Sequence, residues 1–280
     1  MFFIEILKSI VQGIVQGITE WLPVSSTGHI LLLDAVWKME ASADFFDVFK
    51  VIIQLGSILA VVVLYFRNLN PFAPSKSTEE KKGTWVLWSK ILVASVPAAL
   101  IGLALDDIID RYLSVPVVIA AALIIYGIAF LWMENRHKAP TIQQLEDIRY
   151  TQALGIGAFQ ALALIPGTSR SGSTILGATL LGASRTVAAE FSFFMAIPAM
   201  LGASALKLVK YFLLDGMTFT GEEWTLLLIS TVVSFLVSVL VIRFLMAFIK
   251  KHSFKPFGWY RIALGVLVLV MLCLAPNIFQ

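Results

Sequence analysis

The sequence predicts an all-α protein that crosses a membrane several times. Apolar residues make up 59% of its 280 positions and charged residues 14%, whereas a soluble domain carries about 25% charged residues. The apolar runs are continuous and close to the ~20 residues that a membrane-spanning helix needs. They lack the strict alternation of apolar and polar residues that marks a membrane β-barrel. The chain, 1–280, is therefore interpreted as one integral membrane domain.

Six apolar runs are long enough to span a membrane. They lie near residues 45–66, 86–105, 115–133, 188–209, 225–247 and 257–275. Two further apolar stretches, 3–36 and 151–184, are interrupted at their middles by proline, glycine and hydroxyl residues. Irregular backbone is tolerated at membrane depth only where protein buries it or where it lines a cavity. Both stretches are therefore predicted to be re-entrant helical hairpins.

The charges between the spans predict their orientation. The loops 67–90, 134–150 and 248–261 hold twelve lysine and arginine residues, whereas the loops 106–114 and 210–224 hold two. Because basic loops stay in the cytoplasm, the first three loops are expected there and both termini are expected on the outer side. The formal charge of +3 is small and does not favour nucleic acid as a partner.

The two halves of the chain, roughly 1–133 and 145–275, resemble each other. Matching residues recur at an offset of 144, namely Ser25, Thr27 and Gly28 in the first half and Ser169, Ser171 and Gly172 in the second. Each half would consist of one hairpin followed by three spans. Because three is odd, the second half would enter the membrane from the opposite face. Such an inverted repeat places a site near the midplane, between the two hairpins.

Ionisable residues inside the hairpins are the first candidates for chemistry, because a charge at membrane depth is costly and usually functional. The first hairpin holds Glu20 and His29, and the second holds Arg170. Glu20 follows Gln16 by four residues, so both side chains lie on one helix face and could bind Mg²⁺ or Ca²⁺ through oxygen atoms. The alternative for Glu20 is an ion pair with Arg170 that only stabilises the fold.

Hydroxyl residues surround these charges. His29 follows Ser25 and Ser26 closely, and histidine can accept a proton from a hydroxyl near neutral pH. The two serines are therefore candidate nucleophiles, although a buried serine often only bonds a helix carbonyl. Arg170 lies among small residues whose N–H groups can surround an anion, and its guanidinium matches phosphate oxygens. Together these residues predict a site suited to phosphoryl transfer.

The stretches Gln16–His29 and Pro166–Thr174 resemble the two signatures of the bacterial undecaprenyl-diphosphate phosphatases, the bacitracin-resistance family. The stretches Phe49–Val62 and Glu190–Phe193 also fit, so the resemblance covers almost the whole chain. One position departs from the pattern of many members, because Gln16 stands where they carry glutamate. The family accepts either residue, but the glutamine weakens any metal site that needs two carboxylates.

The resemblance implies hydrolysis of undecaprenyl diphosphate to undecaprenyl phosphate and phosphate. This reaction recycles the lipid carrier for peptidoglycan synthesis and confers bacitracin resistance. The resemblance also implies a divalent cation, Mg²⁺ or Ca²⁺, held by Glu20 and Gln16. The protein would be a multi-pass protein of the bacterial plasma membrane, in contact with lipids, with its site opening to the outer face. A homodimer is compatible with the sequence.

Carried onto this chain, the catalytic roles of the family fall on Glu20, Ser26, His29 and Arg170. Ser26 would be the nucleophile with His29 as its base, Glu20 would hold metal or orient the base, and Arg170 would hold the phosphates. Two alternatives stay open, in which His29 itself or a metal-bound water attacks phosphorus. The residues expected to bind phosphate are Ser25, Thr27, Gln54, Ser169, Arg170, Ser171 and Thr174.

The alternative function is a flippase or transporter of the isoprenyl phosphate carrier. An inverted repeat with broken helices is also a transporter plan, and such a protein would need Arg170 as well. It has no evident need for Ser26 near His29, which favours the enzyme. A structural or receptor protein would leave Glu20, His29 and Arg170 freely replaceable, and the cost of burying them argues against that.

Overall fold

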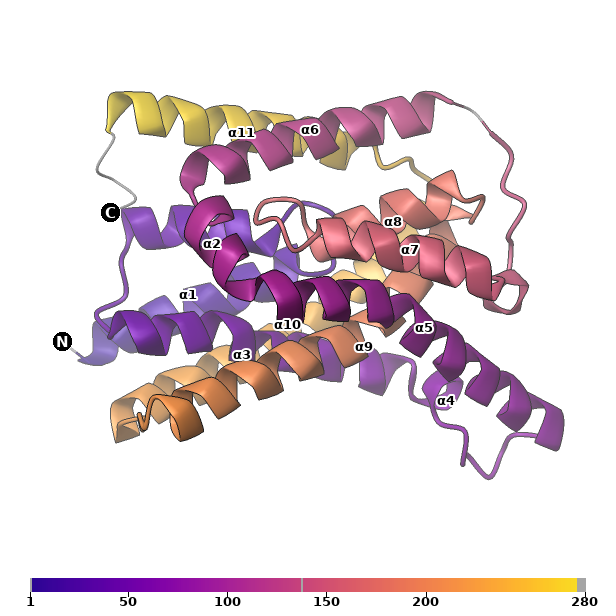
Figure 1. Ribbon diagram of the computed structural model, residues 1–280, viewed down its shortest axis with the longest axis horizontal. Helices are drawn as coiled ribbons and strands as arrows, with labels where there is room; N and C mark the ends of the chain where they lie inside the picture. The colour runs from indigo at the N-terminus through magenta and orange to yellow at the C-terminus, as the bar shows by residue number, and fades with distance from the viewer. Residues whose placement is uncertain (1, 137, 276–280) are drawn as a thin grey trace.

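The computed structural model describes residues 2–136 and 138–275, except for three aspartate side chains between 106 and 110. Within these residues the fold is helical and no strand occurs (Figure 1), which confirms the predicted all-α class. The helices are α1 (Phe2–Thr19), α2 (Ser26–Val36), α3 (Ala43–Leu64), α4 (Phe66–Leu69), α5 (Thr78–Ile108), α6 (Pro116–Asn135), α7 (Tyr150–Leu162), α8 (Arg170–Leu180), α9 (Arg185–Val209), α10 (Gly221–Ile249) and α11 (Lys255–Leu274). The predicted outer position of the termini concerns residues 1 and 276–280, which lie outside the described ranges.

Seven helices in the described part of the chain are long and apolar enough to cross a membrane, so the chain is a multi-pass membrane protein. Six of them, α3, α5, α6, α9, α10 and α11, are the predicted spans. The seventh is α1, the first arm of the hairpin predicted for 3–36, and its re-entrant position stays a prediction. Pro23 interrupts the stretch 3–36 so late that the first arm keeps 18 helical residues, or about 27 Å. The second arm, α2, has 11 residues and is too short to cross.

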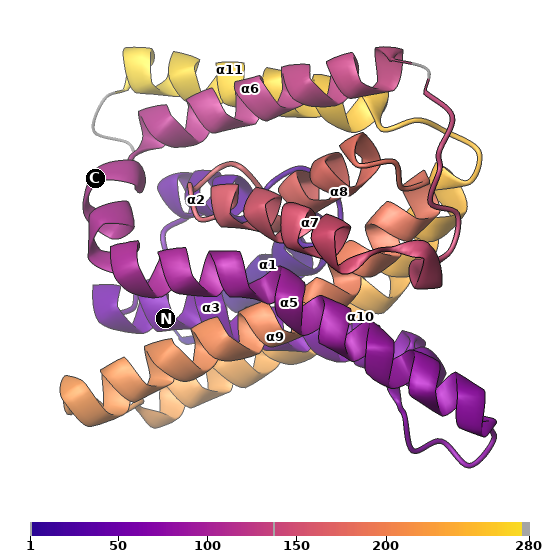
Figure 2. The ribbon, with the colours of Figure 1, turned by 45° about the vertical axis from the view of Figure 1, so that its right-hand side comes forward.

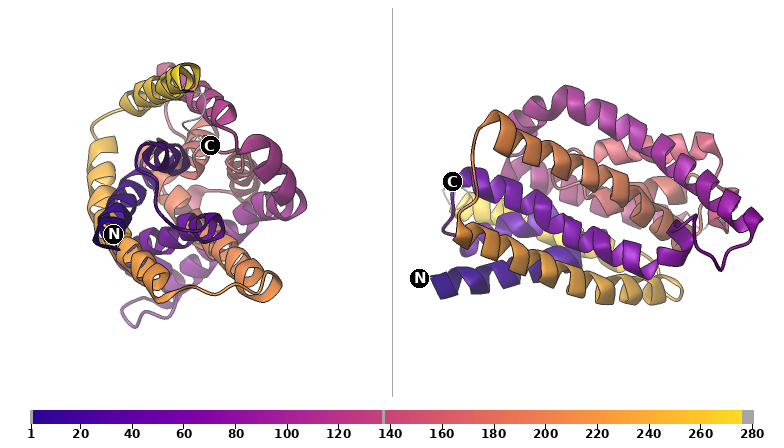
Figure 3. Two further views of the ribbon diagram at one scale, coloured as in Figure 1. Left: turned by 90° about the vertical axis from the view of Figure 1, so that its left-hand side faces the viewer. Right: turned by 90° about the horizontal axis from the view of Figure 1, so that it is seen from below.

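The long helices run along one common direction and surround the two hairpin turns. Helices α6 and α11 lie side by side along one edge, and the α7–α8 hairpin lies between α6 and α5 (Figures 1 and 2). Viewed along the helices, the molecule is a ring of long helices (Figure 3). The turn after α1 contacts the start of α8, since the Ser171 hydroxyl donates to the Glu20 carbonyl at 2.9 Å. The broken segments of both halves therefore meet inside the protein.

The two hairpins turn in the same way. A serine with positive φ precedes the second helix in each, with φ 75° at Ser25 and 71° at Ser169. The Ser25 hydroxyl accepts from the Gly28 N–H at 3.3 Å, and the Ser169 hydroxyl accepts from the Gly172 N–H at 3.1 Å. Positive φ is unfavourable for a non-glycine residue, and the capping bond offsets part of that cost. The inversion of the complete halves stays a prediction.

One part of the predicted charge pattern is wrong. Arg261 was counted in the basic loop 248–261, but it lies within α11 and its side chain is fully buried. Helix α11 begins at Lys255, so it includes the second half of the predicted loop. The other eleven basic residues keep the charge asymmetry between the two sets of loops.

Glycines allow neighbouring helix backbones to come into contact. A Cβ atom at Gly127 on α6 would lie 2.8 Å from the Gly258 carbonyl oxygen on α11, and one at Gly258 would lie 3.0 Å from the Gly127 carbonyl oxygen. Small residues at such crossings drive helix association in membranes, because lipid tails leave little hydrophobic driving force between helices. The α6–α11 pair therefore depends on the absence of side chains at both positions.

We expect Gly127→Ala to lower the free energy of unfolding by about 1–3 kcal/mol, the usual cost of overpacking a filled contact. Gly202→Ala is the matched control, because a Cβ at this helical glycine of α9 meets no atom within 4 Å. Alanine there should be neutral or stabilising by up to about 1 kcal/mol. Denaturant titration in mixed micelles measures both changes. Equal stability of the two variants would contradict the packing argument.

Candidate active site

Glu20 and Arg170 meet between the two hairpins. Arg170 Nη2 donates to Glu20 Oε1 at 3.0 Å, and the two side chains are 13% and 4% exposed for the arginine and the glutamate. The residues lie 150 positions apart in sequence, so this contact joins the two halves. A charge pair removed from water is tolerated only if further hydrogen bonds satisfy its remaining atoms. The Glu20–Arg170 ion pair that the sequence suggested as an alternative is thus present. The residues around it determine whether the pair can also take part in chemistry.

The second carboxylate oxygen of Glu20 accepts two more hydrogen bonds. Gln16 Nε2 donates to Glu20 Oε2 at 2.8 Å, and the Ser26 hydroxyl donates to the same oxygen at 3.1 Å. Glu20 follows the end of α1 and Ser26 opens α2, so the break between these helices brings the two side chains together. A carboxylate within hydrogen-bonding reach of a hydroxyl is placed to take its proton.

Arg170 is held on three sides. Its Nη1 donates to the Ser192 carbonyl at 2.8 Å, and its guanidinium lies 5.4 Å from the centre of the Trp21 ring. Arg170 Nε and Trp21 Nε1 are buried and have no acceptor within the described residues. Buried polar groups are normally hydrogen-bonded, so two N–H donors without acceptors, one of them in the guanidinium itself, could bond an anion.

Both ring nitrogens of His29 are occupied. Nδ1 lies 2.7 Å from the Ser25 carbonyl oxygen, and because a carbonyl only accepts, Nδ1 carries the proton. Nε2 then accepts from the Tyr260 hydroxyl at 2.6 Å, and the two rings are stacked. His29 is not hydrogen-bonded to Ser26, whose contact is the carboxylate of Glu20. The role of His29 as base for Ser26 stays a prediction.

Four of the predicted phosphate ligands are hydrogen-bonded to residues of the two turns or of the first turn of α8, namely Ser25, Ser169, Ser171 and Thr174. Their hydroxyl groups stabilise the breaks that carry Glu20 and Arg170. Thr27 lies in the first turn of α2 and is exposed, and Gln54 lies on α3 and is half-buried. Neither side chain is hydrogen-bonded within the part of the chain that the structure describes, so both are open to a ligand.

Gln16 and Glu20 supply the oxygen atoms available to a divalent cation. Gln16 Oε1 is buried and has no partner among the described residues, and the carboxylate of Glu20 is one helical turn away. Residues 2–136 and 138–275 hold no group of three or more histidine, cysteine or acidic residues that could bind a metal. Two protein oxygens fit an ion such as Mg²⁺, which takes most of its ligands from water and substrate phosphates.

Sequence reasoning missed three residues that contact the hairpins. Tyr260 bonds His29, Ser192 bonds Arg170, and Arg261 donates to carbonyl groups of both turns. Ser192 lies in a stretch that the family resemblance already included, but no role followed from it. Arg261 had a signal in the sequence, because it interrupts the apolar run 257–275 and an arginine there is costly.

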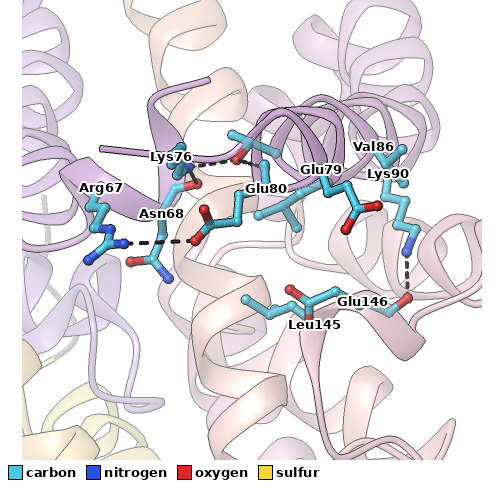
Figure 4. Close-up of a pocket in the computed structure, with 12 residues that line it drawn as sticks. Arg67, Asn68, Lys76, Glu79, Glu80, Val86, Lys90, Leu145 and Glu146 are labelled. Atoms are coloured by element: carbon cyan, nitrogen blue, oxygen red, sulfur yellow. Dashed lines mark hydrogen bonds and ion pairs between the residues drawn. The ribbon is translucent and has the colours of Figure 1, made fainter. Parts of the chain in front are cut away.

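A charged hollow elsewhere in the protein is not part of this site. It encloses about 620 Å³ between α4, α5 and the segment before α7 (Figure 4). Lys76 donates to the Thr84 hydroxyl at 2.6 Å and Lys90 donates to the Glu146 carbonyl at 2.8 Å, while Arg67 faces Glu80 at 3.8 Å. Its cations are therefore engaged by groups of the protein itself, unlike the buried donors beside Arg170.

Known proteins are similar to this chain over nearly its full length. The family model for the bacitracin resistance protein BacA matches residues 9–267, which include both turns. Undecaprenyl-diphosphatase of Enterococcus faecalis is 55% identical over 271 residues, covering 96% of this chain and 98% of the relative. Undecaprenyl-diphosphatase of Lactiplantibacillus plantarum is 56% identical over 268 residues, covering 95% and 97%. Undecaprenyl-diphosphatase 1 of Clostridioides difficile is 56% identical over 266 residues, covering 95% and 96%.

We expect Glu20→Gln to destabilise the protein by about 3–5 kcal/mol, because the change leaves the buried charge of Arg170 without a counter-ion. Inorganic pyrophosphate should restore part of this loss, since an anion can replace the carboxylate. Glu134→Gln is the matched control, because its partner Arg185 is 42% exposed and keeps its hydration. Denaturant titration with and without pyrophosphate measures both effects. The idea fails if pyrophosphate stabilises both variants equally.

Proposed function

The chain belongs to the bacitracin resistance protein BacA family, and from this membership we infer that it hydrolyses undecaprenyl diphosphate to undecaprenyl phosphate and phosphate. The resemblance found in the two sequence signatures is thereby confirmed. The chain is a membrane hydrolase, and its reaction recycles the lipid carrier for cell-wall synthesis and underlies bacitracin resistance. The observation that carries the assignment at the level of the site is the Ser26–Glu20–Arg170 chain of hydrogen bonds.

Ser26 is the proposed nucleophile and Glu20 its base. The Ser26 hydroxyl oxygen attacks the terminal phosphorus, and its proton moves to Glu20 Oε2, to which it is already hydrogen-bonded at 3.1 Å. The bond between that phosphorus and the bridging oxygen breaks, and undecaprenyl phosphate leaves with the bonding electron pair. Water then hydrolyses the phosphoserine and releases phosphate. Splitting the reaction into two displacements is the usual advantage of a covalent nucleophile.

Arg170 binds the phosphate that is transferred. A guanidinium has five N–H donors, and the contacts of Arg170 to Glu20 and Ser192 leave its Nε–H without an acceptor. The free donor can bond an equatorial oxygen of the terminal phosphoryl group, where charge accumulates in the transition state. Preorganised donors of this kind usually supply the largest single part of the rate enhancement.

A divalent cation, Mg²⁺ or Ca²⁺, completes the proposal, with Glu20 and Gln16 as its protein ligands. When bound, it would neutralise charge on the diphosphate. Gln16 Oε1, which is buried and without a partner among the described residues, supports its presence.

The proposed location is a bacterial plasma membrane, with the site open to the outer face. The concentration of basic residues in the segments 67–90, 134–150 and 248–255 supports a cytoplasmic position of those segments. The proposed partners are the isoprenyl diphosphate and the surrounding lipids. A homodimer is a further proposal, which the mass of the purified protein in detergent would test.

We expect phosphate release from undecaprenyl diphosphate in detergent to fall by more than about 10⁴-fold in Ser26→Ala, because this change removes the nucleophile rather than a general base, whose loss costs about 10²–10⁴-fold. His29→Ala should lose less than Ser26→Ala. Ser95→Ala is the matched control, because the Ser95 hydroxyl only bonds the Ile91 carbonyl within α5.

The outcomes separate the candidate nucleophiles and functions. Abolished turnover in folded His29→Ala together with nearly normal turnover in Ser26→Ala would assign the attack to His29. Residual turnover in both variants would favour water. Folded wild-type protein that releases no phosphate would exclude the enzyme and leave the carrier flippase.

We expect a chelator to abolish phosphate release, and added Mg²⁺ or Ca²⁺ to restore it, because two protein oxygens hold the ion only weakly. Gln16→Ala removes one of these oxygens, so it should raise the cation concentration needed for half-maximal rate. Gln160→Ala is the control, because this buried glutamine lies at the equivalent position of the second hairpin and has no acidic neighbour one turn later. Full activity in chelator would remove the cation from the proposal.

A further inference from the structure

Arg261 joins the two hairpin turns through their backbones. Its side chain is fully buried in α11. Nη1 donates to the Pro23 carbonyl at 3.0 Å, in the turn between α1 and α2. Nη2 donates to the carbonyls of Gly167 at 3.0 Å and Thr168 at 2.8 Å, in the turn between α7 and α8. One guanidinium from a third segment thus contacts both breaks.

These carbonyl groups need a donor from outside their own segments. Helix α1 ends at Thr19 and α7 ends at Leu162, so the residues of the turns have lost the ladder of helix hydrogen bonds. An unpaired carbonyl at membrane depth is costly, and irregular backbone persists there only where protein satisfies it. The planar fork of an arginine can bond several acceptors in fixed directions. Arg261 therefore fixes where the two turns lie relative to each other.

The charge of Arg261 has no carboxylate partner within the described residues. Its guanidinium lies 5.5 Å from the centre of the Tyr126 ring, which is a weaker compensation than a counter-ion. The charges of Glu20 and Arg170 compensate each other. The two turns therefore carry one excess positive charge at membrane depth. Such a charge is costly to bury, and the charges that proteins do bury there are usually functional.

We propose that Arg261 is a positioning residue of the phosphatase site, which sets the two turns in register and supplies the uncompensated charge that attracts the diphosphate. Its guanidinium is buried and engaged by carbonyl groups, so it acts through the turns and through its field rather than by contact with substrate. A field of this kind is strong in a low-dielectric interior. This inference rests on the proposed function.

Substitutions separate the two parts of this role. Lysine at 261 keeps the charge but lacks the planar fork, so it cannot bond all three carbonyls in place. Glutamine removes the charge. Gly172→Ala keeps the charge and disturbs the geometry, because a Cβ at 172 would lie 2.9 Å from Arg261 Nη1, the donor to the Pro23 carbonyl. Arg243→Gln is the control, because Arg243 is an exposed arginine of α10.

The test uses full-length protein in detergent and compares variants that elute as wild type does from size exclusion. One measurement is the kcat and KM of phosphate release from undecaprenyl diphosphate. The other is the rise in melting temperature caused by inorganic pyrophosphate, which does not depend on turnover. Arg261→Lys and Gly172→Ala should lower kcat about 100-fold, the cost of misplacing reacting groups by ~1 Å, and should leave KM and the pyrophosphate shift nearly unchanged.

Arg261→Gln should lower kcat similarly, raise KM about tenfold and lose most of the pyrophosphate shift, because both bonds and charge are gone.

Folded Arg261 variants that match Arg243→Gln in kcat, KM and shift would overturn the inference and leave the phosphatase intact. If wild type released no phosphate but showed a pyrophosphate shift that Arg261→Gln abolishes, the phosphatase would fail and the charge role would be supported. If neither Arg261 variant folds, a wild-type kcat in Gly172→Ala overturns the positioning role.

Discussion

The ion pair between Glu20 and Arg170 is the interaction on which the rest of this structure depends. Each charge is costly inside a membrane protein, and removing either one leaves the other buried without compensation. The pair lies where two broken helices face each other, and 150 residues separate its members. The breaks that expose backbone, the serines that cap them and the long helices that enclose them can all be understood as the surroundings that such a pair needs.

In the proposed mechanism the same pair links substrate binding to catalysis. In the structure the guanidinium of Arg170 is partly occupied by the carboxylate that also bonds the Ser26 hydroxyl. In the proposed mechanism, a phosphate group bound at the Nε–H of Arg170 lies next to the carboxylate that accepts the Ser26 proton. Binding energy from the diphosphate can thus be used at the reacting atoms, which is what separates catalysis from tight binding.

Much of this arrangement could be predicted from the sequence, because hydrocarbon thickness fixes the length of spans and makes charges and breaks within apolar runs conspicuous. Glu20, Ser26 and Arg170 stood out for that reason. The late break leaves α1 as an arm of full length, and the length and composition of such an arm are the same for a re-entrant helix and for a span. The Tyr260–His29 contact joins residues 231 positions apart, and no local pattern says which helix will face a turn. Arg261 interrupts an apolar run near its start and is costly there, but no local pattern shows which carbonyl groups it will bond.

The position of Arg261 along the chain has a consequence for how the protein is made. Helices leave the ribosome in order, from the N-terminus onward. Arg261 follows Pro23 by 238 residues and Gly167 by 94, so both turns are synthesised well before the side chain that bonds their carbonyls. A nascent chain that lacks α11 lacks the three hydrogen bonds from Arg261 to the carbonyls of its turns. On the role proposed for Arg261, insertion of α11 is therefore the step of biogenesis that sets the two turns in register.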